Sequence, residues 1–101
     1  MSYAIDNLPP VHPGRFLRKD LEALGLSARK FAESIHVPHN AITEIMNGER
    51  SITAAMAIRL SKAFGTTAQY WLNLQTTYDL KRAWAELPQS ALDEIHTYRA
   101  A

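Results

Sequence analysis

Residues 26–48 of the chain read LSARKFAESIHVPHNAITEIMNG, and this stretch predicts two short helices separated by a tight turn. Ser27 is a good N-cap for the first helix, because its hydroxyl can accept a hydrogen bond from a backbone N–H of the first turn. Pro38 interrupts the helical pattern, since it disfavours a helical conformation at Val37 and is itself suited to a first helical position. Apolar residues recur at helical spacing in between, at Ala28, Phe31, Ala32 and Ile35.

The second helix is expected to run from about Pro38 to Asn47-Gly48, where glycine readily adopts the left-handed conformation that ends a helix. Successive residues rotate by about 100°, which separates an apolar face from a polar one. The apolar face carries Ala41, Ile42, Ile45 and Met46. The opposite, hydrogen-bonding face carries His39, Asn40, Thr43, Glu44 and Asn47.

Two short helices joined by such a turn make a helix-turn-helix. The major groove of B-DNA admits one α-helix, whose short polar side chains can reach base edges. Asn40 suits adenine N6 and N7, Glu44 can accept from cytosine N4, and Thr43 can bond a base or pack on a thymine methyl group. The alternative is a solvated helix face, and phosphates repel Glu44 unless it finds a base donor or an arginine. The predicted base-contacting residues are His39, Asn40, Thr43 and Glu44.

A second group of side chains is expected to contact phosphates. Ser27 and Arg29 lie at the N-terminus of the first helix, where the helix dipole and free N–H groups favour an anion. Arg50 and Ser51 directly follow the second helix. The alternative for each basic residue is an ordinary solvated charge. The predicted phosphate-contacting residues are Ser27, Arg29, Lys30, Arg50 and Ser51.

The remaining chain is predicted to support this pair of helices in one all-α domain of five or six helices, covering residues 1–101. An extended arm (1–11) precedes a helix-turn-helix core (12–65), which is followed by C-terminal dimerisation helices (66–101). The core adds two helices to the central pair. The first begins near Pro13, ends at Gly25 and buries Phe16 or Leu17, Leu21 and Leu24; the second is capped by Thr53, ends at Gly65 and buries Met56, Ala57, Leu60 and Phe64.

The helix after Gly65 has too many apolar residues for one face: Trp71, Leu72, Leu74, Tyr78, Leu80, Ala83 and Trp84. One stripe is expected to pack on the helices that begin near Pro13 and Thr53. The other stripe is left for a second copy of the chain, because exposed apolar patches commonly mark interfaces. The predicted interface residues are Trp71, Leu74 and Tyr78. Leu87-Pro88 ends this helix, and Ser90 is expected to cap a last one that runs to about Arg99.

Composition narrows the possible functions. The chain has 101 residues, 47% of them hydrophobic, with a formal net charge of +1 and no cysteine. There is room for one core but not for a separate catalytic domain, and bulk charge gives no argument for nucleic-acid binding. No stretch suggests a membrane span or signal peptide, so we expect a cytoplasmic protein without membrane association. The histidines His12, His36, His39 and His96 show no metal-ligand spacing, and no phosphate loop or activated nucleophile is recognisable. We expect no enzyme activity, no metal and no cofactor.

The central stretch resembles the phage-repressor type of helix-turn-helix, and three further segments resemble the HigA family of toxin-antitoxin antitoxins. These segments are His12-Pro13-Gly14, NGERSITAAMAIRLSKAFGT (47–66) and YWLNLQTTYDL (70–80). The chain departs from the pattern at Ala28, where such repressors often carry a phosphate-binding glutamine. His36 stands where the turn usually has glycine, at a cost of order 1 kcal/mol if its φ is positive, and Pro38 replaces the usual hydroxyl cap.

The resemblance implies a homodimer that binds a palindromic double-stranded operator, represses its own operon and neutralises a cognate HigB-type toxin, a RelE-like mRNA-cleaving ribonuclease. Two alternatives stay open: a stand-alone phage-type transcriptional regulator, and a protein-interaction module that no longer binds DNA. The small net charge, Ala28 and Glu44 support the second alternative. Neither the operator sequence nor the toxin-binding surface follows from the residues, and whether the toxin enhances or relieves DNA binding stays open.

Overall fold

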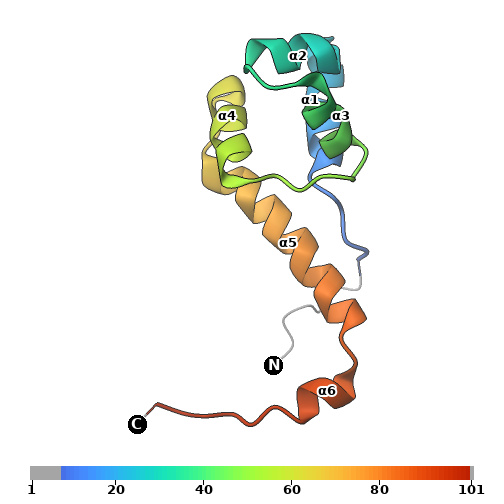
Figure 1. The fold of residues 1–101 in the computed structure, drawn as a ribbon, viewed down its shortest axis with the longest axis vertical. Coiled ribbons are helices and arrows are strands. Elements are labelled where there is room, and N and C mark those ends of the chain that lie inside the picture. Colours follow the sequence, from blue (N-terminus) through green and yellow to red (C-terminus); the bar gives the residue numbers. More distant parts are fainter. Residues whose placement is uncertain (1–7, 101) are drawn as a thin grey trace.

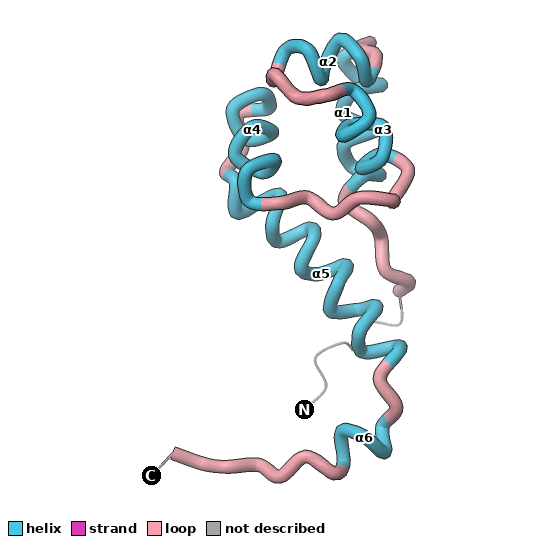
Figure 2. Tube along the Cα trace, in the orientation of Figure 1, coloured by secondary structure: helices cyan, strands magenta, loops and turns pink. Residues whose placement is uncertain are grey.

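The computed structural model describes residues 8–100, and all regular structure in that range is helical (Figures 1 and 2). The predicted all-α fold is therefore confirmed, while residues 1–7 of the predicted N-terminal arm lie outside the described range. The helices are α1 (Gly14–Leu24), α2 (Ala28–Ser34), α3 (His39–Met46), α4 (Ala54–Phe64), α5 (Ala68–Glu86) and α6 (Gln89–Asp93).

Local capping signals set most of the helix boundaries as predicted. Ser27 Oγ accepts from the Lys30 N–H at 3.1 Å, and Thr53 Oγ1 accepts from the Met56 N–H at 3.2 Å. Pro38 is the N-cap of α3, so that helix begins one residue later than expected, at His39. His36 has a φ of 61°, so the turn keeps a positive φ at this position and bears the cost of order 1 kcal/mol that such a φ implies. The helix-turn-helix, α2 and α3, is confirmed.

The core lies where α1 to α5 meet. Leu17 and Leu21 of α1 are buried in it, but Leu24 is 60% exposed, so its predicted burial is wrong. Leu24 lies in the last turn of α1, at the edge of an open groove toward α4, where no helix covers it. The other buried apolar residues are Phe31, Ala32, Ile35, Ala41, Ile42, Ile45, Ile52, Met56, Ala57, Leu60 and Trp71.

Helix α5 begins in the core and then leaves it (Figure 1). Trp71 is 0% exposed, and its Nε1–H donates to Thr66 Oγ1 at 2.9 Å. We therefore remove Trp71 from the predicted dimer interface, since a side chain enclosed by its own domain offers no surface to a second copy. The first turns of α5 pack on α4. Further along, Leu80 and Trp84 are 55% and 42% exposed.

The C-terminal segment differs from the prediction. Leu87-Pro88 does end α5, but the last helix is only Gln89–Asp93, and Pro88 rather than Ser90 is its N-cap residue. The chain beyond Glu94 has no regular structure up to residue 100. Ile95 and Tyr98 are 68% and 86% exposed, so a longer helix would have no packing to stabilise it.

None of the helices described between residues 8 and 100 is long and apolar enough to cross a membrane.

Candidate nucleic-acid interface

The outward face of α3 is set by the residues that anchor its inner face. Ala41, Ile42 and Ile45 are buried, so the opposite side of the helix is turned away from the core. His39 and Asn40 are exposed at the start of the helix, and Thr43 and Glu44 are half-buried one turn later. The structure thus brings the four predicted base-contacting residues together on one short helix.

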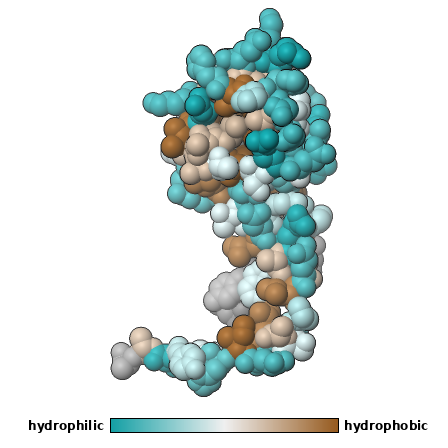
Figure 3. Space-filling model, viewed as in Figure 1, coloured by the Kyte–Doolittle hydropathy of each residue, from teal (hydrophilic) through white to brown (hydrophobic). Residues whose placement is uncertain are grey.

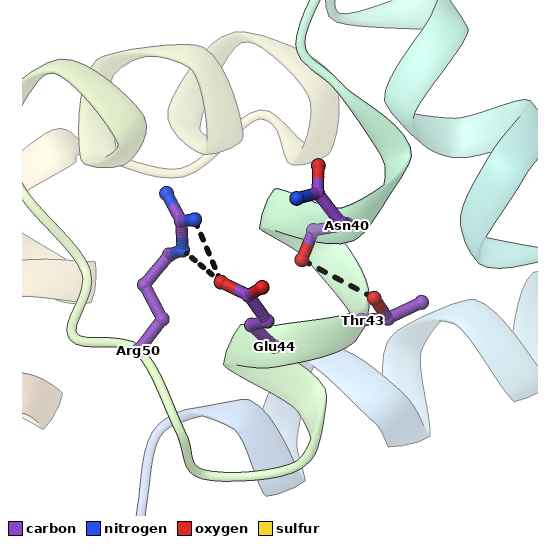
Figure 4. A network of polar contacts seen from close by, with 4 residues as sticks. All are labelled: Asn40, Thr43, Glu44 and Arg50. Atoms are coloured by element: carbon purple, nitrogen blue, oxygen red, sulfur yellow. Dashed lines mark hydrogen bonds and ion pairs between the residues drawn. The ribbon is translucent and has the colours of Figure 1, made fainter.

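Thr43 and Asn40 are linked through the helix backbone. Thr43 Oγ1 donates to the Asn40 carbonyl oxygen at 3.2 Å, which leaves the hydroxyl oxygen able to accept but uses its one proton. The Asn40 side-chain amide is exposed and keeps both its donors and its acceptor (Figure 4). Asn40 is therefore the side chain on this face best equipped for a bidentate contact.

Glu44 forms an ion pair with Arg50, a residue that we predicted to contact phosphate. Arg50 Nε donates to Glu44 Oε1 at 2.8 Å, and Arg50 Nη2 lies 2.6 Å from the same oxygen (Figure 4). Arg50 comes from the loop after α3, yet its guanidinium lies back over that helix. The carboxylate charge that argued against DNA binding is thereby neutralised within the predicted interface.

The start of α2 holds the other predicted phosphate contacts. Ser27 is exposed, but its hydroxyl oxygen already caps the Lys30 N–H. The Arg29 and Lys30 side chains are exposed and have no side-chain partner in the described part of the chain. Ser51 Oγ accepts a long hydrogen bond, 3.4 Å, from Gln75 Nε2.

Gln75, which the sequence analysis missed, ties the loop after α3 to α5. It is only 6% exposed; its Oε1 accepts from the Ile52 N–H at 2.8 Å, and its Nε2 also donates to Asp79 Oδ1 at 3.0 Å. The available signal was its spacing, since Gln75 stands four residues after Trp71 and shares its buried face. This amide holds the segment that carries Arg50 and Ser51.

Two residues of α1 hold the C-terminal end of α3. Arg18 Nη2 donates to Asn47 Oδ1 at 3.0 Å and to the Met46 carbonyl at 3.3 Å. At Gly14, a Cβ atom would overlap the Ile45 carbonyl oxygen, so only glycine permits this close approach of α1 and α3. The Gly14 of the His12-Pro13-Gly14 segment therefore positions the candidate recognition helix.

His12 lies at the start of α1. Its Nδ1 accepts from the Gly14 N–H at 2.9 Å, and its ring lies edge-on to Tyr78 with 4.8 Å between centroids. Partial burial lowers the pKa of His12 below its usual value, against the opposing attraction of Asp79. The ring is thus a neutral acceptor that joins the start of α1 to α5. Tyr78 is half-buried by this contact and remains a predicted interface residue.

An open apolar groove lies between α2 and α4, and none of the residues predicted to contact DNA lines it (Figure 3). Its volume is about 780 Å³, and Leu24, Leu26 and Ile58 are among its lining residues. Arg59 also lines the groove, and its Nη1 donates to the Ile35 carbonyl at 2.6 Å. The sequence analysis assigned nothing to this groove. Among residues 8–100, no three histidine, aspartate or glutamate side chains gather in a way that could hold a metal ion.

Comparison with known proteins agrees with this geometry. A family model described as helix-turn-helix matches residues 17–71. Virulence-associated protein I of Dichelobacter nodosus is 48% identical over 79 residues, which is 77% of this chain and 73% of that relative. An addiction module antidote protein of the HigA family from Coxiella burnetii has a solved structure that is 43% identical, with a TM-score of 0.86 over 90% of this chain and 100% of that one.

A third relative is the Pseudomonas aeruginosa antitoxin HigA, solved with the higBA promoter. It is 38% identical, and the TM-score is 0.81 over 86% of this chain and 96% of that one. The matched domain and its fold make this chain a member of the helix-turn-helix family of DNA-binding regulators. Within that class, it belongs to the HigA family of antitoxins.

Proposed function

We propose that this chain is an antitoxin that binds its own operator as a dimer, represses the operon that encodes it and neutralises a RelE-like mRNA-cleaving toxin. The observation that carries the DNA-binding part is the exposed polar face of α3, on which His39 and Asn40 are exposed beside the Glu44–Arg50 pair. This proposal is supported by the relative from Pseudomonas aeruginosa, whose structure includes promoter DNA.

Dimerisation is supported by the part of α5 that projects from the domain. Leu80, Trp84 and Leu87 are 55%, 42% and 49% exposed, and their spacing puts them on one side of the helix. A stripe of this kind exposes apolar surface in a monomer and would bury it in a symmetric pair. Two recognition helices can enter successive major grooves only if the dimer sets them about 34 to 36 Å apart.

The DNA-binding part is tested by fluorescence anisotropy with labelled DNA from directly upstream of the gene. A scrambled duplex is the control, and both duplexes are titrated over a series of salt concentrations. We expect tighter binding to the upstream DNA, with the logarithm of the binding constant falling linearly with the logarithm of salt concentration. Equal binding to both duplexes, or no binding, would contradict operator recognition.

The toxin-neutralising part needs a separate test, because a stand-alone regulator would pass the first one. The product of the adjacent reading frame is expressed with and without this chain, and cell growth and mRNA integrity are followed. We expect growth arrest and mRNA cleavage that this chain relieves, together with co-purification of the two proteins. An adjacent product that is harmless and does not bind would leave the stand-alone regulator as the function.

A further inference from the structure

The ion pair between Glu44 and Arg50 is built by the end of α3. Gly48 adopts a φ of 76°, its N–H donates to the Ile45 carbonyl at 3.0 Å, and the Glu49 N–H donates to the Glu44 carbonyl at 2.8 Å. These bonds reverse the chain after the helix. Arg50 follows directly, and its side chain returns to the outward face of α3. The pair is thus set by the backbone as well as by charge.

The pairing leaves defined hydrogen-bonding groups unused. Both Arg50 Nε and Arg50 Nη2 engage the same carboxylate oxygen, Glu44 Oε1. Three N–H donors therefore remain, and two of them, one on Nη1 and the second on Nη2, lie on one edge of the guanidinium. Glu44 Oε2 also remains as an acceptor, on the side of Oε1 that faces away from the guanidinium (Figure 4). Figure 4 shows this group on the same side of α3 as the Asn40 amide.

Folding stability gives little reason for this arrangement. The Arg50 and Glu44 side chains are 47% and 37% exposed, and an ion pair with that much contact with water contributes little to stability. In binding, however, the pairing has a clear effect. It removes the repulsion between Glu44 and phosphates and holds a flexible arginine in one place, which lowers the entropy lost on contact with a ligand.

The free donors and the free acceptor match one base pair. In the major groove, guanine presents O6 and N7 as two acceptors, and its partner cytosine presents the N4 amino group as a donor. We propose that Arg50 and Glu44 act as one unit that reads a G·C pair in each operator half-site: Arg50 donates to guanine O6 and N7, and Glu44 Oε2 accepts from cytosine N4. This inference rests on the proposed DNA binding, and it replaces our expectation that Arg50 contacts a phosphate.

The test begins with the full-length chain and a randomised library of DNA duplexes. Enrichment of a preferred half-site by the wild-type chain establishes specific binding, and an absence of enrichment would contradict the proposed function itself. The selection is repeated with Arg50→Gln and with Glu44→Gln. We expect both variants to lose their preference at the same G·C position, by about 5- to 150-fold for Arg50→Gln, and to keep the preferences at other positions.

Arg29→Gln is the matched control, since Arg29 is an exposed arginine at the start of α2 rather than on the outward face of α3. We expect it to weaken binding to all sequences alike and to leave the preferred half-site unchanged. If Arg50→Gln behaves in this way too, Arg50 is a phosphate contact and the inference is wrong. If Arg50 and Glu44 variants alter different base pairs, the two residues do not act as a unit.

A second measurement does not depend on selection. The guanine at the assigned position is replaced by 7-deazaguanine, which lacks the N7 acceptor. We expect the wild-type chain to bind this duplex several-fold more weakly than the unmodified one, and Arg50→Gln to bind both alike. Equal sensitivity of the two proteins would overturn the assignment. Circular dichroism of each variant confirms that the helical fold is kept.

Discussion

The backbone N–H of Ile52 donates to Gln75 Oε1 at 2.8 Å, a contact that joins the loop after α3 to the middle of α5. Both groups are buried, so the bond cannot be replaced by water without a rearrangement. We expect Gln75→Ala to lower the free energy of unfolding by about 1 to 3 kcal/mol, because it leaves a buried N–H without a partner. Urea denaturation measures this loss.

Gln75→Glu is the matched control for that prediction. It keeps an oxygen that can accept from Ile52 but places a carboxylate next to Asp79, which now accepts from Gln75 Nε2. Asp79→Asn removes this repulsion. We expect the double variant Gln75→Glu with Asp79→Asn to be more stable than Gln75→Ala. An alanine variant as stable as the wild type would show that the loop is held by other contacts.

Gly14 determines how closely α1 approaches α3. A Cβ at this position would overlap the Ile45 carbonyl oxygen, and backbone atoms cannot move aside as a flexible side chain can. Overpacking typically costs about 1 to 3 kcal/mol, and we expect Gly14→Ala to lower the free energy of unfolding by at least that much. Gly25→Ala is the control, because its Cβ would meet nothing within 4 Å and only its φ of 68° is unfavourable. Equal losses for both variants in urea denaturation would contradict the packing argument.

The pKa of His12 makes stability depend on pH. Burial lowers this pKa in the folded state, and Nδ1 must be unprotonated to accept from the Gly14 N–H. The unfolded chain therefore binds a proton more readily than the folded chain does. The stabilisation is complete above the ordinary histidine pKa of about 6.5 and is lost as the pH falls below it. We expect the free energy of unfolding to decrease between pH 7.5 and pH 5.5.

His12→Asn isolates this effect from the other histidines. The asparagine oxygen can accept from the Gly14 N–H but does not titrate in this range. We expect the variant to lose less stability than the wild type over the same pH range. The two curves, each measured by urea denaturation at a series of pH values, would be parallel if His12 did not contribute.

Most of the fold could be predicted because its signals are local. Ser27, Thr53 and Gly48 define helix ends through bonds to residues three or four positions away, so the sequence around them suffices. What the sequence did not show involves contacts between helices or across a turn. The burial of Trp71 and the exposure of Leu24 depend on where α4 lies, and the Glu44–Arg50 pair depends on the chain reversal at Gly48. The chemistry and spacing of the side chains therefore identified the candidate site residues. They did not predict which of these residues pair with each other.

Asn40 has an exposed side-chain amide on the outward face of α3. If its amide makes a bidentate contact with adenine, Asn40→Ala should weaken operator binding by about 1 to 3 kcal/mol. The fold should not change, since Asn40 is exposed and only its backbone carbonyl accepts a hydrogen bond from another side chain. Anisotropy at matched salt measures the loss. An unchanged affinity would remove Asn40 from the predicted contacts.

The exposed stripe of α5 makes a specific prediction for assembly. Leu74 is half-buried against the core of its own domain, so a charge there would disturb the fold as well as an interface. Trp84 lies further along the helix and is 42% exposed, and it shares a face with Leu80. We expect Trp84→Asp to shift the protein from dimer to monomer in sedimentation experiments, because it puts a charge where apolar surface would be buried. Ala85→Asp introduces the same charge one residue later, about 100° around the helix, and should stay dimeric. If Trp84→Asp also sediments as a dimer, the two copies do not meet along this stripe, and the spacing of the two recognition helices must be set by another surface.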